Sequence, residues 1–148
     1  MDEVIEKLKI AFGTSFAFYM KAHNFHWNVE GPQFYQFHEF FGDIYEEVQS
    51  SLDATAEQIR TLDAYTPGSL GRLQELSTVG PEERVGLSPL EMVKILLEDN
   101  DKTRTAMLNA FAAAEKENLQ GLMDHLAARI DAHNKHRWML NSHLKKVG

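Results

Sequence analysis

The sequence predicts one all-α domain spanning residues 1–148, a four-helix bundle built from two antiparallel helix pairs and one long crossover. Two observations support this fold class. Apolar residues recur at helical spacing along four long segments, and the breaks between these segments fall at glycine, proline or polar residues. With only four prolines and nine glycines, most of the chain is free to be helical, and 43% hydrophobic residues can fill one core.

The first helix pair is expected from the N-terminal part of the chain. The first helix runs from Asp2 to about Trp27, with apolar side chains every three or four positions. The sequence NVEGP (28–32) then breaks it, because Pro32 has the fixed φ that suits the first turn of a new helix. The second helix runs from Pro32 to about Leu62 with a broad apolar stripe, and is about 45 Å long at 1.5 Å per residue.

The second pair follows a long crossover. Residues 64–89 hold three of the four prolines, and they could include a short helix around Leu70 to Leu76. The third helix begins at SPLE (88–91), where serine at N-cap, proline at N1 and glutamate at N3 make a complete capping box, and runs to about Glu115. The fourth helix spans roughly Leu119 to Lys145. Two short turns and one long crossover give the ferritin-like type of four-helix connectivity.

Composition excludes several kinds of site. The chain has no cysteine, so disulfides, thiolate metal sites and cysteine nucleophiles are excluded, and a metal would have to bind through histidine and carboxylate. No apolar run approaches the roughly 20 residues that span a bilayer, and the acidic start MDEVIEKLK lacks the basic region of a signal peptide. We therefore expect a cytoplasmic protein with no membrane segment. The net charge of −7 disfavours nucleic acid and anionic lipid and attracts cations.

Three side chains of the second helix share one face but cannot share one site. Asp53 and Glu57 stand at i and i+4, and His38, fifteen residues before Asp53, is offset from it by only about 60°. Fifteen helical residues rise about 22 Å, whereas a metal ligand must lie about 2 Å from its metal. Two subunits can complete the site if their second helices pack antiparallel about a twofold axis, which places His38 of each opposite Asp53 and Glu57 of the other.

A second histidine is expected beside His38. His26 ends the first helix, and the chain reversal near Gly31 brings it back to the start of the second helix. Two imidazoles from one chain and two carboxylates from its partner suit Fe(II), Mn(II) or Zn(II) and leave coordination positions open for an oxidant. The alternative for each residue alone is ordinary: a packed histidine or a solvated carboxylate.

The stretch from His23 to Leu62 resembles a known family, the Dps-like mini-ferritins, named for the DNA-binding protein from starved cells. Its signature H-W-N-x-x-G-x-x-F-x-x-x-H, followed by D-x-x-x-E, is found here as HWNVEGPQFYQFH (26–38) and DATAE (53–57). The resemblance implies a dodecameric shell that oxidises Fe(II) with hydrogen peroxide or O2, stores ferric iron and protects against oxidative stress. It assigns His26 and His38 as ligands from one subunit and Asp53 and Glu57 from its twofold mate.

One position departs from the family pattern. Many relatives have an acidic residue four positions after the second histidine, where this chain has Gly42. Asp43 is adjacent and could be an accessory ligand, but one residue turns a helical side chain by about 100°. The second metal position therefore stays open in this sequence. The resemblance also places Trp27 beside the centre, where it could quench radicals or simply pack in the interface.

Other acidic residues and histidines have weaker assignments. Asp124, with Glu115 and Glu117, could line an iron-entry pore at a threefold axis or form a solvated helix end. His133, His136 and His143 could form an auxiliary metal patch, although exposed polar positions on a long helix are the more ordinary interpretation, also for His125. His23 could support the centre or be solvated surface. Only the positions of these residues in the sequence support these assignments.

Two alternative functions follow from the same residues. An intrasubunit di-iron enzyme commonly uses Glu-x-x-His on facing helices, and no glutamate in this sequence has a histidine three residues later. A nucleoid-associated or structural shell with a weak or inactive centre stays open because of Gly42. DNA binding itself is expected to be weak or absent, because the N-terminus is acidic at Asp2 and Glu3 and the C-terminus offers only Lys145 and Lys146.

Overall fold

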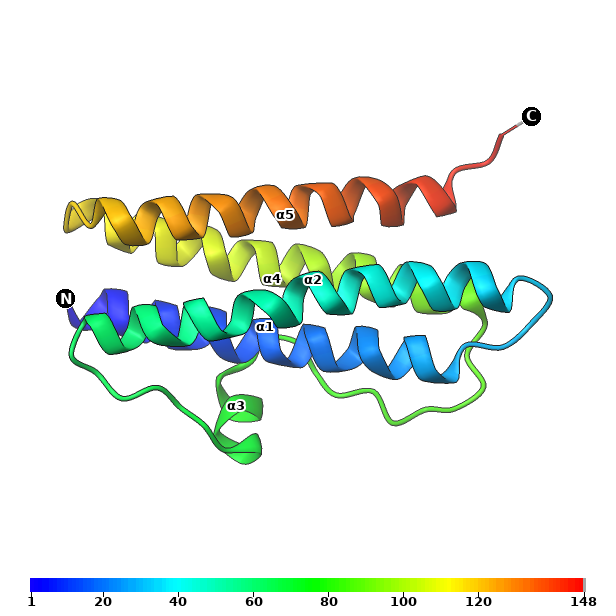
Figure 1. Ribbon diagram of the computed structural model, residues 1–148, viewed down its shortest axis with the longest axis horizontal. Coiled ribbons are helices and arrows are strands. Elements are labelled where there is room, and N and C mark those ends of the chain that lie inside the picture. The colour runs from blue at the N-terminus through cyan, green and yellow to red at the C-terminus, as the bar shows by residue number, and fades with distance from the viewer. Residues whose placement is uncertain (148) are drawn as a thin grey trace.

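The computed structural model of the protein describes residues 1–147, and the predicted all-α fold is confirmed. Four long helices lie in two antiparallel pairs, and a short fifth helix lies outside them in the crossover (Figure 1). The helices are α1 (Asp2–Asn28), α2 (Phe34–Thr61), α3 (Leu70–Leu76), α4 (Pro89–Lys116) and α5 (Gln120–Leu144). Helix α1 packs on α2, α4 packs on α5, and α1 also packs on α4 and α3. In residues 1–147, no helix is both long and apolar enough to cross a bilayer.

The ends of the helices follow local chemistry. The predicted capping box of α4 is confirmed: the Glu91 amide donates to the Ser88 hydroxyl at 3.1 Å, and the Ser88 amide donates to the Glu91 carboxylate at 2.8 Å. Helix α2 begins at Phe34, two residues later than predicted from Pro32. Gly31, at φ 128°, makes a turn in which its carbonyl accepts from the Phe34 amide at 3.0 Å.

The interior has two apolar clusters, one near each end of the bundle. One cluster includes Leu8 of α1, Met107 of α4 and Leu126 of α5. The other is rich in aromatic residues and includes Phe18 of α1 and Phe41 of α2, both fully buried. Burying large side chains of this kind contributes roughly 1.5–3 kcal/mol each, which holds the four long helices together without disulfides.

A polar layer separates the two apolar clusters along α4 and α5. Asp99 and Asn100 of α4 and Arg129, His133 and His136 of α5 are all buried. Two of these side chains were predicted as exposed helix positions, and that prediction is wrong: His133 is 0% exposed and His136 is 7% exposed. Their face of α5 turns toward the bundle because each side chain has a hydrogen-bonding partner on another helix.

Glu47 of α2 is the hub of this layer. Its carboxylate accepts a bidentate pair of hydrogen bonds from Arg129, at 2.6 and 3.0 Å, and a third from His136 Nε2 at 2.8 Å. Burial alone would raise the pKa of Glu47, but the hydrogen bonds from His136 and Arg129 lower it well below its usual range. His133 bonds through Nδ1 to the Asn100 side chain at 2.7 Å. Burial, with Arg129 and His136 nearby, lowers the pKa of His133 to about 3.

Acid is expected to destabilise the protein through His133. In the unfolded chain a histidine takes up a proton below pH of about 6.5, whereas folded His133 stays neutral down to about pH 3. The free energy of unfolding is therefore unaffected by this residue above pH of about 6.5 and falls as the pH is lowered from that value to about 3. The expected loss between pH 7 and pH 5 is about 2 kcal/mol for this residue. Urea unfolding of wild type and His133→Gln at both pH values, at one protein concentration, measures the difference.

The control for this prediction is His143→Gln, which removes another imidazole from the same helix. In His143→Gln, the free energy of unfolding should depend on pH as it does in wild type. In His133→Gln, this dependence should be weaker, whatever the free energy of unfolding at pH 7. An equal loss between pH 7 and pH 5 in wild type and in His133→Gln would show that His133 does not cause it.

Candidate metal centre

His26 and His38 meet where α1 and α2 are joined by the turn at the right of Figure 1. His26 Nδ1 donates to the backbone carbonyl of His38 at 2.6 Å, and His38 Nδ1 donates to the backbone carbonyl of His26 at 2.6 Å. The two rings stack with centroids 3.8 Å apart and planes 18° apart. The structure thus brings together the two histidines that the sequence places twelve residues apart.

These reciprocal bonds determine which nitrogen of each ring is free. A carbonyl oxygen can only accept, so each Nδ1 carries the proton of its neutral ring. Each Nε2 then has a lone pair that can bind a metal ion. A carbonyl that fixes the tautomer and the orientation of an imidazole is the usual support of a histidine ligand. Each ring of the pair therefore keeps one nitrogen available to bind a metal ion.

Gly42 is the reason that the His26 ring can lie against α2. A Cβ at this position would be 3.1 Å from Nδ1 and 3.2 Å from Cε1 of His26, closer than ordinary van der Waals contact. Position 42 therefore faces the centre, as the family pattern implies, but His26 occupies the space of the missing side chain. The adjacent Asp43 lies elsewhere: with Glu47 and His136 it lines a cavity of about 260 Å³ between α2 and α5.

Replacing Gly42 is expected to weaken metal binding. In Gly42→Ala the methyl group pushes the His26 imidazole and disturbs its bond to the His38 carbonyl. Loss of such a supporting contact lowers metal affinity roughly tenfold or more. Anaerobic calorimetric titration with Fe(II) measures the change, and Gly121→Ala, which has open space around it, is the matched control. Equal affinity of Gly42→Ala and wild type would show that the ring position is not needed.

The carboxylates of the predicted site lie far along α2 from the histidines. Asp53 and Glu57 are exposed near the end of α2, and this end lies at the left of Figure 1. By helical rise, Asp53 is about 22 Å and Glu57 about 28 Å from His38. Between them Thr55 is buried and bonds through its hydroxyl to His125 Nε2 at 2.9 Å. Within residues 1–147, no group of three or more histidine, aspartate or glutamate side chains gathers to hold a metal. One chain thus holds two separate halves of a ligand set.

Aromatic side chains surround the histidine pair, and sequence reasoning missed two of them, Tyr19 and Tyr45. His23 lies between Tyr45, on which it stacks at a centroid distance of 3.8 Å, and Trp27, whose ring is 3.9 Å away and tilted by 32°. Tyr45 is also 5.1 Å from the His26 ring. The four-residue spacing of Tyr19, His23 and Trp27 puts them on one face of α1, and this pattern could have found Tyr19.

The aromatic cluster changes the acidity of its members. Burial, followed by the nearby His26 imidazole, lowers the pKa of His23, and burial, followed by Tyr45, raises the pKa of Tyr19. At neutral pH, therefore, the imidazole is neutral and the phenol keeps its proton. The Tyr19 hydroxyl lies 2.9 Å from His23 Nδ1.

The remaining predicted residues lie outside the histidine cluster. His143 packs on Phe40, with ring centroids 4.3 Å apart, and donates from Nδ1 to the Met139 carbonyl at 2.8 Å. It does not join His133 and His136 in a metal patch among residues 1–147. Asp124 is exposed near the turn between α4 and α5, and Glu117 of that turn bonds to the N-terminal ammonium at 3.1 Å. The pore assignment of Asp124 stays a prediction.

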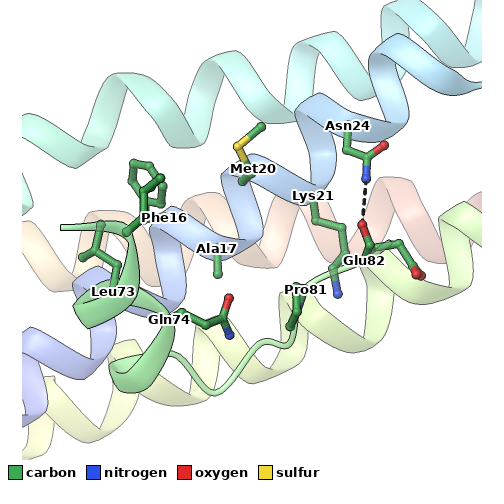
Figure 2. Close-up of a pocket in the computed structure, with 11 residues that line it drawn as sticks. Phe16, Ala17, Met20, Lys21, Asn24, Leu73, Gln74, Pro81 and Glu82 are labelled. Carbon is green, nitrogen blue, oxygen red and sulfur yellow. Dashed lines mark hydrogen bonds between the residues drawn. The ribbon is translucent and has the colours of Figure 1, made fainter. Parts of the chain in front are cut away.

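A second hollow lies between α1, α3 and the crossover. Figure 2 shows it lined by apolar side chains such as Phe16 and Leu73, with Asn24 donating to the Glu82 carbonyl at 3.3 Å across one end. Its volume is about 270 Å³. Both charged groups of the lining are already paired, Lys21 with Asp99 and Glu82 with Arg84. The groove offers apolar surface rather than acid–base chemistry.

Comparison with known proteins gives one consistent result. The ferritin-like domain family matches residues 5–148. The DNA protection during starvation protein of Brevibacillus brevis is 32% identical over 127 residues, which cover 86% of this chain and 85% of that protein. DNA protection during starvation protein 2 of Bacillus anthracis is 28% identical over 144 residues, or 97% and 98% of the two chains. The crystal structure of Dps from Staphylococcus aureus superposes with a TM-score of 0.93 at 28% identity, covering 99% of this chain and 98% of that one.

Proposed function

The chain belongs to the ferritin-like family and within it to the Dps proteins, and on this basis we propose that it oxidises Fe(II) and stores ferric iron. The observation that carries the proposal is the reciprocal bonding of His26 and His38, which engages both Nδ1 atoms and leaves both Nε2 atoms available for metal. Asp53 and Glu57, exposed on the same helix, supply the matching carboxylates. Iron is the substrate of this chemistry, and the shell is its store.

The site is completed by a second copy of the chain. We propose that α2 of two subunits packs antiparallel about a twofold axis, which sets His26 and His38 opposite the partner subunit's Asp53 and the partner subunit's Glu57. Large apolar side chains are exposed on α1 and α2 near the histidines: Trp27 is 56% exposed and Phe34 is 42% exposed. Contact with a second copy would remove this surface from water. Further contacts would build the dodecamer that the family resemblance implies.

The proposed reaction follows from the ligand set. Neutral imidazoles and carboxylates suit Fe(II), and the carboxylate charge favours Fe(III) after oxidation. Two Fe(II) ions give two electrons to one hydrogen peroxide, which takes two protons and becomes two waters, so no free radical is released. O2 is the alternative oxidant. The net charge of −7 on each chain attracts the cation to the shell. In a cytoplasmic setting this reaction would protect against oxidative stress.

Stopped-flow oxidation of Fe(II) by hydrogen peroxide tests the function. Wild type should oxidise iron far faster than the buffer does, and His38→Ala and Glu57→Ala should each lose most of that rate. The control is Glu46→Ala, which removes an exposed carboxylate of α2 that is outside the ligand set. Identical rates in wild type, His38→Ala and Glu57→Ala would leave only a structural shell.

A structural or nucleoid-associated shell is the second candidate, favoured by the contact between Gly42 and His26. This contact fills the place at which relatives hold a second metal, so the centre could be weak. A nucleoid-associated shell would then act by binding DNA, yet the net charge of −7 opposes contact with phosphate. We expect a gel shift at low salt without magnesium to show weak or no binding. Tight binding would favour the second candidate.

A further inference from the structure

We propose that the tail after α5, residues 145–147, docks in an acidic pocket of a neighbouring copy of the chain. The tail brings the lysine pair Lys145 and Lys146 and the apolar side chain of Val147 to this contact. The inference rests on the proposed function, in which twofold pairs build a shell, and it names the contact that links one pair to the next.

The acidic pocket lies between the end of α1, the crossover and the start of α4. Its volume is about 440 Å³. Its floor is apolar, because Phe25 and Met92 line it and both are almost fully buried. Three carboxylates also line it, those of Glu30, Glu82 and Glu83. A segment that fits this pocket combines an apolar side chain with positive charge.

Two of these carboxylates lack a cation from their own chain. Arg84 donates to the Glu82 carboxylate from Nε at 3.0 Å and from Nη2 at 2.6 Å, and these bonds lower the pKa of Glu82 to about 2. The charge of Arg84 is thereby matched. Glu30 and Glu83 are exposed and form no ion pair within residues 1–147. Two positive charges from another chain would balance the pocket.

The tail presents two such charges at the surface. Lys145 ends α5 with extended backbone, at φ −77° and ψ 139°, and the chain leaves the bundle at the end where α1 and α2 are joined (Figure 1). Lys145 and Lys146 are exposed, and Val147 is 98% exposed. Burial of this valine on an apolar floor is favourable, and the lysines then meet the carboxylates at the rim.

The tail cannot fill the pocket of its own chain. It leaves the bundle on the side opposite the crossover (Figure 1), and α5 packs on α4 and α2. Three extended residues reach about 10 Å, which is only about the diameter of one helix. The occupant is therefore the tail of a second copy. A twofold contact alone ends at a pair, whereas a contact between two different surfaces joins copies head to tail and can close into a ring.

Reversal of charge on each side tests the contact. Lys145→Glu with Lys146→Glu, and separately Glu30→Lys with Glu83→Lys, should each raise roughly tenfold or more the protein concentration at which half of the shell dissociates, because like charges then face each other. All four changes in one chain should return that concentration to near the wild-type value. Sedimentation velocity over a dilution series measures it. If neither double variant changes it, the docking is overturned.

The matched control is Lys94→Glu with Lys135→Glu, which changes the net charge equally at two other exposed lysines. Equal weakening of the shell by this control would assign the effect to net charge and overturn the docking. Isolated twofold pairs keep both halves of each ligand set, so the variant at Lys145 and Lys146 should oxidise Fe(II) at the wild-type initial rate per chain. Failure of wild type to oxidise iron would overturn the proposed function, while the dilution series still decides the docking.

A cysteine-free chain allows a direct test of proximity. Val85 lines the acidic pocket and is 92% exposed, so Val85→Cys with Val147→Cys places one thiol on each side of the contact. A short bismaleimide should link these chains into multimers beyond the dimer. Tyr65→Cys with Val147→Cys, at a position that is 84% exposed and outside the pocket lining, should give several-fold less. Equal linking in the two proteins overturns the docking.

Discussion

Co-assembly of two inactive variants is expected to restore about one quarter of the wild-type rate of Fe(II) oxidation. One variant lacks the imidazoles (His26→Ala with His38→Ala), and the other lacks the carboxylates (Asp53→Ala with Glu57→Ala). Each alone has only half of every ligand set. In a mixed pair, the imidazoles of one chain meet the carboxylates of the other, which gives one intact site and one empty site. Random pairing makes half of the pairs mixed, hence about one quarter of the sites intact.

Co-expression of the two variants with different affinity tags, followed by stopped-flow oxidation of Fe(II), measures the recovery. Mixing the two purified variants without exchange of subunits is the control and should give no activity. If the co-assembled protein is as inactive as each variant alone, the imidazoles and the carboxylates do not meet across a subunit interface. Activity in either variant alone would show that the missing ligands are not needed.

Loss of the buried ion pair between α1 and α4 is expected to cause the largest change in stability. Lys21 Nζ and Asp99 Oδ2 are 2.6 Å apart, and both side chains are more than nine-tenths buried. Asp99→Ala leaves the Lys21 ammonium without its partner in the interior, which costs about 3–5 kcal/mol. Adding Lys21→Met removes the unpaired charge and should recover most of that loss. Urea unfolding of the single and double variants measures the coupling.

The exposed pair of Arg137 and Asp101, 3.1 Å apart, is the matched control because it also begins on α4. Asp101→Ala should cost less than about 1 kcal/mol, as is usual for an ion pair at the surface. If Asp99→Ala and Asp101→Ala lower the free energy of unfolding equally, loss of the buried partner of Lys21 costs no more than loss of an exposed partner.

The fold could be predicted from the sequence because its signals are local. The capping box at Ser88 and the turn at Gly31 depend on a few adjacent residues, and the structure shows both. The buried positions of His133 and His136 could not be predicted, because polar residues on a helix are normally exposed and their partners, Asn100 and Glu47, are on other helices. Periodicity in one segment does not reveal such pairings.

The candidate site was predictable in part for the same reason. The meeting of His26 and His38 follows from one chain reversal, whose position the sequence marks with Gly31. The protonation of the two rings depends on backbone carbonyls whose direction appears only in three dimensions. The close approach of the His26 ring to Gly42 likewise depends on how α1 packs on α2 in three dimensions.

The buried charge between α1 and α4 also sets the alignment of the helices. A slide of α1 along α4 by one turn, about 5.4 Å, would keep apolar surface in contact with apolar surface. It would, however, pull the Lys21 ammonium from the Asp99 carboxylate and leave two ions unsolvated. Only one longitudinal register avoids this penalty. The ion pair thus fixes the height at which α1 presents His26, to within a fraction of a helical turn.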